Sequence, residues 1–212
     1  MTDDEPVQEI VARLRAAGCV FAEDEAALLV AAAAGDAAEL ERLVRERETG
    51  TPLEQVLGWA EVDGIRVAVA PGVFVPRRRS VLLVRLAADR TPPDTVAVDL
   101  CCGSGALGAA LAVRRPDLEV HAADVDPAAV ACARRNLPAD RVHEGDLYDA
   151  LPDRLRGRVG VLLVNAPYVP TDAIALMPPE ARDHEHRVAL DGGPDGLDVQ
   201  RRVCAGVAGW LA

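Results

Sequence analysis

The pattern of apolar and polar positions changes twice along the chain. Residues 6–17 and 24–47 carry Ala, Leu, Glu and Arg in helical periodicity without interior proline, so each stretch predicts a helix. In residues 51–76, TPLEQVLGWAEVDGIRVAVAPGVFVP, the pair Asp63-Gly64 lies between alternating apolar residues and predicts a β-hairpin. We therefore expect a small helical domain over residues 1–50, followed by a hairpin connector.

Beyond residue 76, apolar runs alternate with helical patterns. After a helix near residues 80–88, we predict strands in VAVDL, VHAAD, RVHEGD and VGVLLVN, and helices in GALGAALAVRR and PAAVACARRNL. Strands that alternate with helices indicate a parallel sheet covered by helices. Residues 77–212 are thus expected to form a Rossmann-like α/β domain that ends in a helix, LDVQRRVCAGVAGWLA, after four parallel strands.

Composition narrows the class of protein. Half of the 212 residues are hydrophobic, so the chain can bury a core. A net charge of −11 disfavours nucleic acid as the main ligand, because binding to a phosphate backbone depends on cations. The five cysteines have no metal-ligand spacing and are expected to be reduced thiols. Neither a signal peptide nor a membrane-spanning run is seen, which predicts a cytoplasmic protein with no membrane partner.

A glycine loop follows the first predicted strand of the α/β domain. In VAVDLCCGSGALGAALA, Gly103, Gly105 and Gly108 match GxGxxG between a strand and a helix. Glycines let the backbone approach a ligand closely, and the helix N-terminus presents free N–H groups. The motif alone is also compatible with a tight packing turn. Its place between strand and helix favours a dinucleotide or another adenosine-containing cofactor.

Two acidic residues lie at the ends of the next strands. Asp124 comes nineteen positions after Gly105 (124 − 105), where a carboxylate can accept both ribose hydroxyls. Asp146 ends the third strand, where it can face an adenine amino group while Leu147 packs on the ring. Each acid alone is compatible with a solvated strand end. Together they point to the crevice where parallel sheets bind ligands.

The fourth strand ends in Asn165, Ala166, Pro167 and Tyr168. The lone pair of an amide or aryl amine is delocalised, so such a nitrogen must be held in line before it attacks a methyl group. The side-chain oxygen of Asn165 and the carbonyl of Ala166 can each accept one of its N–H groups. Tyr168 can stack on a flat group, and Pro167 stiffens the loop. A simple strand-terminating loop is the alternative interpretation.

The sequence resembles the class I S-adenosylmethionine-dependent methyltransferases over residues 96–168, where NAPY is similar to their NPPY motif. The connector and the segment RVALDGGPDGLDVQRRV resemble the protein glutamine side-chain amide methyltransferases that modify peptide-chain release factors. This resemblance covers residues 7–212. It implies a class I methyltransferase fold, S-adenosylmethionine as cofactor, and methylation of a glutamine amide in a release factor docked by the helical domain.

The resemblance also implies the residues of the site, with no metal among them. The residues expected to bind the cofactor are Asp99, Cys101, Gly103, Ser104, Gly105, Asp124, Val125, Asp146, Leu147 and Asn165. The expected catalytic residues are Asn165, Ala166, Pro167 and Tyr168, and the expected substrate-binding residues are Arg77, Pro167 and Tyr168. Pro76 and Arg77 are expected to border the cofactor entrance. His184-Glu185-His186 lacks a third metal ligand and is expected to be a solvated loop.

Three departures from the family pattern keep alternatives open. Ala166 replaces the first proline of NPPY, and PRRRS at residues 76–80 replaces PRPET, which suggests a paralogous branch. The Arg77–Arg79 run can contact a partner or stay solvated. Family members continue with strands that complete a seven-stranded sheet, so we expect a C-terminally incomplete domain, or a sheet edge that a partner supplies or that stays exposed. The alternatives are a methyltransferase for base amines in RNA or DNA, and a non-catalytic binding paralogue.

Overall fold

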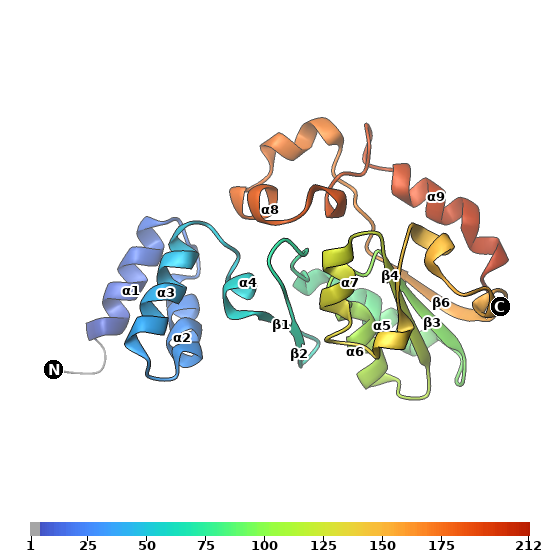
Figure 1. Cartoon of the computed structure of the whole chain (residues 1–212), viewed down its shortest axis with the longest axis horizontal. Coiled ribbons are helices and arrows are strands. Elements are labelled where there is room, and N and C mark those ends of the chain that lie inside the picture. The colour runs from blue at the N-terminus through green and yellow to red at the C-terminus, as the bar shows by residue number, and fades with distance from the viewer. Residues whose placement is uncertain (1–4) are drawn as a thin grey trace. The chain divides into compact units, whose positions relative to one another are not determined.

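The computed structural model describes residues 5–212 (Figure 1), which divide into two compact units between Gly58 and Trp59. This boundary runs through the connector expected over residues 51–76, so its first eight residues belong to the helical unit and the rest to the second unit. Across the described residues, no helix has both the length and the apolar composition needed to span a membrane.

The first unit is built from helices, whose bounds are α1 (Glu5–Ala16), α2 (Ala22–Ala33), α3 (Ala37–Glu48) and α4 (Leu53–Leu57). Leu14 and Leu29 are fully buried in its core, and Val44 is nearly so. In α1 the buried residues Ile10, Val11 and Leu14 recur at the spacing of a helix, so this helix turns one apolar face toward the others.

The prediction of one helix over residues 24–47 is wrong, because the chain turns between α2 and α3. Ala34 and Gly35 adopt left-handed φ angles of 50° and 89°, which end α2. The Asp36 carboxylate then accepts the backbone N–H groups of Ala38 and Glu39 at 2.9 and 3.1 Å and so caps α3. In a sequence, glycine followed by aspartate indicates that one helix ends and another begins.

The second unit begins with a hairpin of β1 (Trp59–Val62) and β2 (Ile65–Ala68), which pair antiparallel. Asp63 and Gly64 form the turn with φ angles of 49° and 84°, so the predicted hairpin is confirmed. The Asp63 carboxylate binds Arg85 at 3.1 Å and also contacts Arg114. These ion pairs fix the hairpin against the helices that carry the two arginines.

Within the described part of the chain, the four predicted strands form a parallel sheet, and their order in it is β5-β4-β3-β6. Their bounds are β3 (Val96–Leu100), β4 (Glu119–Asp124), β5 (Val142–Glu144) and β6 (Val159–Val164). Helix α5 (Val81–Arg90) precedes β3, α6 (Ala106–Arg114) follows β3, and α7 (Pro127–Ala133) follows β4. The sheet and its helices form the Rossmann-like α/β arrangement that the sequence predicted.

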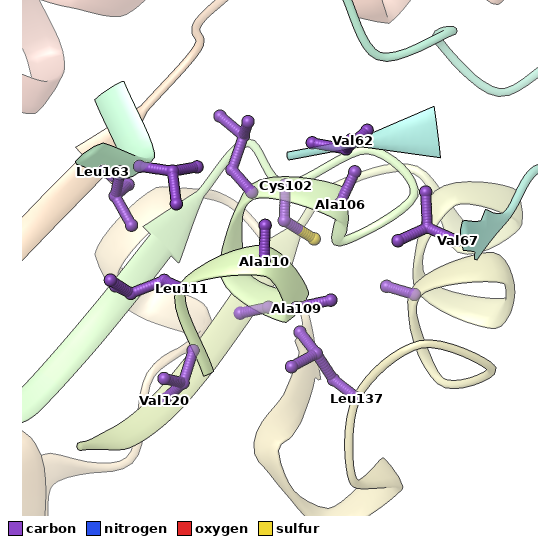
Figure 2. Packing of buried hydrophobic residues seen from close by; sticks show 14 of the residues in the cluster. Val62, Val67, Cys102, Ala106, Ala109, Ala110, Leu111, Val120, Leu137 and Leu163 are labelled. Atoms are coloured by element: carbon purple, nitrogen blue, oxygen red, sulfur yellow. The ribbon is translucent and has the colours of Figure 1, made fainter. Parts of the chain in front are cut away.

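Alternation along β3 divides the core between the two faces of the sheet. Val96, Val98 and Leu100 pack in a cluster with residues of the C-terminal helix, whereas Ala97 packs in the cluster that contains α5 and α6. Figure 2 shows this second cluster around α6, with residues of the hairpin at its edge. Asp99 has the same parity as Ala97, and its side chain accordingly turns toward α6.

After β6 the chain forms α8 (Pro179–His184) and α9 (Asp198–Gly206). The helix predicted over residues 197–212 ends early, because Val207–Gly209 forms a 3-10 turn and the last residues are extended. Val159 donates its N–H to the carbonyl of Trp210, and Ala212 donates to the carbonyl of Val159, both at 3.0 Å. The other 3-10 turns are Arg78–Ser80, Ala139–Arg141, Leu147–Ala150, Asp153–Leu155, Thr171–Leu176 and Arg187–Ala189.

Candidate active site

The glycine loop follows directly after β3. Cys101, Gly103 and Gly105 adopt left-handed φ angles of 57°, 55° and 72°. A Cβ atom on Gly105 would lie 3.0 Å from the Cβ of Ala133, so glycine permits the loop to pack against α7. The loop therefore combines a tight turn with close packing beneath it. It brings Cys101, Gly103 and Ser104 to the wall of a cavity.

Asp99 is buried at the end of β3, with 1% of its surface exposed. Its Oδ2 accepts the N–H of Gly108 at 2.8 Å, and its Oδ1 has no hydrogen-bond partner within residues 5–212. Burial raises the pKa of Asp99 to about 7, against the lowering effect of the Gly108 N–H and with the Asp124 charge adding to the rise. The carboxyl group is thus held in an environment that would favour a cationic or donating ligand.

Asp124, at the end of β4, organises the backbone around it. Its Oδ2 accepts the N–H of Gly103 at 2.8 Å, and its Oδ1 accepts the N–H of Asp126 at 2.9 Å. These bonds orient the carboxylate but leave lone pairs on both oxygens for hydroxyl donors. Burial raises the pKa of Asp124, which the two backbone N–H groups partly offset.

Asp146 follows β5 and, with Leu147, lines the same cavity. Half of its side chain is exposed, and its Oδ2 accepts a hydrogen bond from Arg202 of α9 at 2.6 Å. The sequence did not predict this partner, although Arg202 lies in a segment that carried the resemblance. The Asp146–Arg202 ion pair connects α9 to the part of the cavity where we expect the adenine of the cofactor.

The loop after β6 brings only part of the NAPY motif to the cavity. Asn165 and Pro167 line it, whereas Ala166 is buried at 6% exposure and Tyr168 is 47% exposed. The Tyr168 hydroxyl accepts a hydrogen bond from Arg79, whose guanidinium lies 6.0 Å from the ring centroid. Neither Ala166 nor Tyr168 is among the residues that line the cavity.

The segment around His184 is not the solvated loop that the sequence predicted. Glu185 is 5% exposed, and its Oε1 accepts the N–H of Val75 at 3.0 Å and a guanidinium N–H of Arg77 at 2.7 Å. His186 contacts Asp126. Arg77, predicted to bind substrate, therefore has an internal partner and also lines the cavity.

These segments enclose one cavity of about 720 Å³ in the second unit. Of the residues expected to bind the cofactor, all except Gly105 line it. Pro76, Arg77 and Pro167 line it as well. The wall also contains residues that the sequence did not single out, among them Phe74, Thr171, Arg187, Val188, Ala189 and Arg202.

The family model described as "Methyltransferase small domain" matches residues 64–177, more than half of the chain. The chain belongs to the methyltransferase small domain family. It is 40% identical over 179 residues to a release factor glutamine methyltransferase of Mycolicibacterium smegmatis, covering 82% of this chain and 63% of that protein. Proteins of the same name from Streptomyces coelicolor and Geobacter sulfurreducens are 40% and 35% identical over 75% and 80% of this chain, and 58% and 62% of their own lengths.

The resemblance found in the sequence is thereby confirmed. The chain spans about three fifths of the length of the relatives it matches. Membership of this methyltransferase family implies use of S-adenosylmethionine in general.

Two features of the cavity fit that molecule. Asp99 Oδ1 and Ser104 Oγ are buried polar atoms without a partner in residues 5–212, and both residues line the cavity. A ligand with an ammonium and a carboxylate group would provide the missing donor and acceptor.

Proposed function

We propose that this chain methylates the side-chain amide nitrogen of a glutamine in a peptide-chain release factor, with S-adenosylmethionine as the methyl donor. The names of its relatives support this substrate. The observation that carries the proposal is at the end of β6. No residue in the described part of the chain donates a hydrogen bond to the Asn165 side chain or to the Ala166 carbonyl, and Asn165 lines the cavity that contains Asp99.

The cavity residues divide into sets for the parts of the cofactor. Asp99 and Ser104 would bind its polar methionine end, together with the backbone of Cys101 and Gly103. Asp124 and Val125 would contact the ribose, and Asp146 and Leu147 the adenine. When bound, S-adenosylmethionine supplies a methyl group attached to a positively charged sulfur. The buried carboxyl groups of Asp99 and Asp124, whose pKa values burial raises, favour a ligand of that charge.

The acceptors of the NAPY loop would activate a glutamine amide by orientation. Its nitrogen lone pair is delocalised into the carbonyl, so the amide attacks only when it is held in line. The Asn165 side-chain oxygen and the Ala166 carbonyl would each accept one amide N–H. Alignment of this kind contributes several kcal/mol, on the order of that from an oxyanion hole. As nitrogen gains the methyl group it becomes acidic and releases a proton to water, so no strong base is required.

The rest of the chain has supporting roles in this proposal. Tyr168 and Pro167 would contact the flat amide, and Arg77 would border the entrance. Ala166 retains the carbonyl that the chemistry needs. The helical unit would bind the protein substrate, and work on release factors would place the enzyme in the cytoplasm.

The test is transfer of a labelled methyl group from S-adenosylmethionine to a purified release factor. Asn165→Ala should lower the turnover rate about 100-fold, because one of two acceptors is lost. A release factor whose target glutamine is replaced should take no label. Cofactor binding without labelled factor would refute the substrate, and absence of cofactor binding would refute the methyltransferase activity.

A further inference from the structure

One wall of the cavity is a segment that crosses from α8 to α9, which we call the cover segment (residues 185–193). It is held at its start by the loop before Pro76, because His186 donates its N–H to the carbonyl of Gly72 at 2.7 Å. It is held at its end by the NAPY loop, because Gly192 donates its N–H to the carbonyl of Val169 at 2.9 Å. The residues of the cover segment that line the cavity are Arg187, Val188, Ala189, Asp191, Gly192 and Gly193.

A side-chain contact joins the cover segment to the loop after β4. His186 Nδ1 donates to Asp126 Oδ2 at 2.6 Å. Asp126 itself is held firmly, because its Oδ1 accepts the N–H of Ala128 at the start of α7 and its own N–H binds Asp124. His186 therefore reaches the loop that carries Asp124 and Val125, which also line the cavity.

The position of the histidine ring depends on Gly72. A Cβ atom at Gly72 would lie 2.3 Å from His186 Nε2, and the residue has a left-handed φ of 80°. Only glycine leaves room for the ring to pass over the backbone and reach Asp126. The contact thus rests on Gly72, His186 and Asp126, which are far apart in the sequence.

The His186–Asp126 contact lies at the surface and not in the core. About half of the His186 side chain is exposed, whereas Asp126 is 10% exposed. The contact can therefore open without moving Leu190, the buried apolar residue of the cover segment, and its loss would loosen that segment while the sheet stays folded. These properties are those of a latch on a binding site.

We propose that His186 and Asp126 form a latch that holds the cover segment over the cavity and so slows the release of S-adenosylmethionine. This inference rests on the proposed function for the identity of the ligand. His186 acts as a positioning residue, through the cover segment.

The first experiment compares cofactor binding by the full chain and by variants of the pair. His186→Ala should raise the Kd of S-adenosylmethionine roughly three- to tenfold, the effect of one charge-assisted hydrogen bond, and mainly through faster dissociation. Asp126→Ser should do the same while keeping the cap of α7, because serine is also a good N-cap residue. The double variant should be no worse than either single one, since both remove the same contact.

His186→Asn is the matched rescue variant, because its amide nitrogen replaces Nδ1 at the same distance from the backbone. It should restore the dissociation rate to within about twofold of the original. If the His186→Ala and original proteins release the cofactor at equal rates, the latch is refuted. A loss that His186→Asn does not rescue would also refute it, since the ring would then act only by packing.

The second experiment uses the protein without ligand and so does not depend on the proposed function. In His186→Ala, the amides of residues 186 and 192 should exchange with solvent at least threefold faster, while amides within β3 and β4 stay unchanged. Unchanged exchange in the cover segment would refute the latch. If the original protein fails to bind S-adenosylmethionine, the ligand assignment falls, and the exchange result alone decides whether the contact closes the cavity.

Discussion

The buried carboxyl group of Asp99 makes a sharp prediction about stability and pH. Its pKa is ordinarily 3.8 and is raised by burial to about 7 in the folded protein. The folded state therefore keeps a proton on Asp99 at pH values where the unfolded chain has lost it. The stability from this group is present at acidic pH and is lost as the pH rises toward 7.

The magnitude follows from the two pKa values. Between pH 5 and pH 8 the unfolded carboxyl is ionised throughout, whereas the folded one ionises near pH 7. From pH 5 up to the folded pKa of about 7, each pH unit lowers the unfolding free energy by about 1.4 kcal/mol. The two units together give a loss of about 3 kcal/mol. In Asp99→Asn this loss disappears. The substituted amide keeps an oxygen for the Gly108 N–H, but it places a buried NH2 group where an unpartnered oxygen was, at a cost of about 1–3 kcal/mol that does not depend on pH.

The assay is urea unfolding of both proteins at pH 5 and pH 8, followed by tryptophan fluorescence. Trp59 and Trp210 both lie in the unit that contains Asp99. The difference in unfolding free energy between Asp99→Asn and the original protein should shift by about 3 kcal/mol in favour of the variant at pH 8. The same difference at both pH values would refute the reasoning. Asp99→Asn should also bind S-adenosylmethionine at least tenfold more weakly, because a charge that favours the cofactor is lost.

Two further predictions concern the loop and the sheet. Gly105→Ala should destabilise the protein by about 1–3 kcal/mol, because its φ is 72° and the new Cβ would lie 3.0 Å from that of Ala133. Gly157→Ala, with a φ of 66° and open space around it, is the matched control and should cost less, so equal costs in denaturant unfolding would contradict the packing argument. Burial lowers the pKa of His121, which contacts Glu119 at 2.9 Å, so its contribution to stability should be lost as the pH falls below about 6.5. His121→Gln should reduce that loss between pH 7 and pH 5, and an unchanged pH dependence would show that His121 is not its source.

Local patterns were sufficient to predict the framework of the second unit. The pair Asp63-Gly64 predicted the hairpin turn, because both residues tolerate left-handed φ angles. The four parallel strands were predicted from short apolar runs between helical patterns. The acids Asp99, Asp124 and Asp146 line one cavity because strands that run parallel end at the same edge. The break at Ala34 was also local and was missed because helical composition continues on both sides of it.

The pairs across the cavity could not be predicted in this way. Asp146 and Arg202 are 56 positions apart, and Arg77 and Glu185 are 108 apart. The two members of each pair lie in separate segments that only the tertiary fold brings together. Periodicity reports which face of an element is buried but carries no information about which distant charge meets it.

Several unfavourable features lie at the cavity. Asp99 Oδ1 and Ser104 Oγ are buried without partners, and Cys101 and Leu147 hold left-handed backbone conformations that non-glycine residues seldom adopt. Each lowers the stability of the protein without ligand. A ligand that binds only the folded state adds to stability in proportion to its affinity, and one that neutralises Asp99 also removes the cost of ionising it. The same residues that weaken the empty fold are therefore the ones that would make its stability depend on the cofactor.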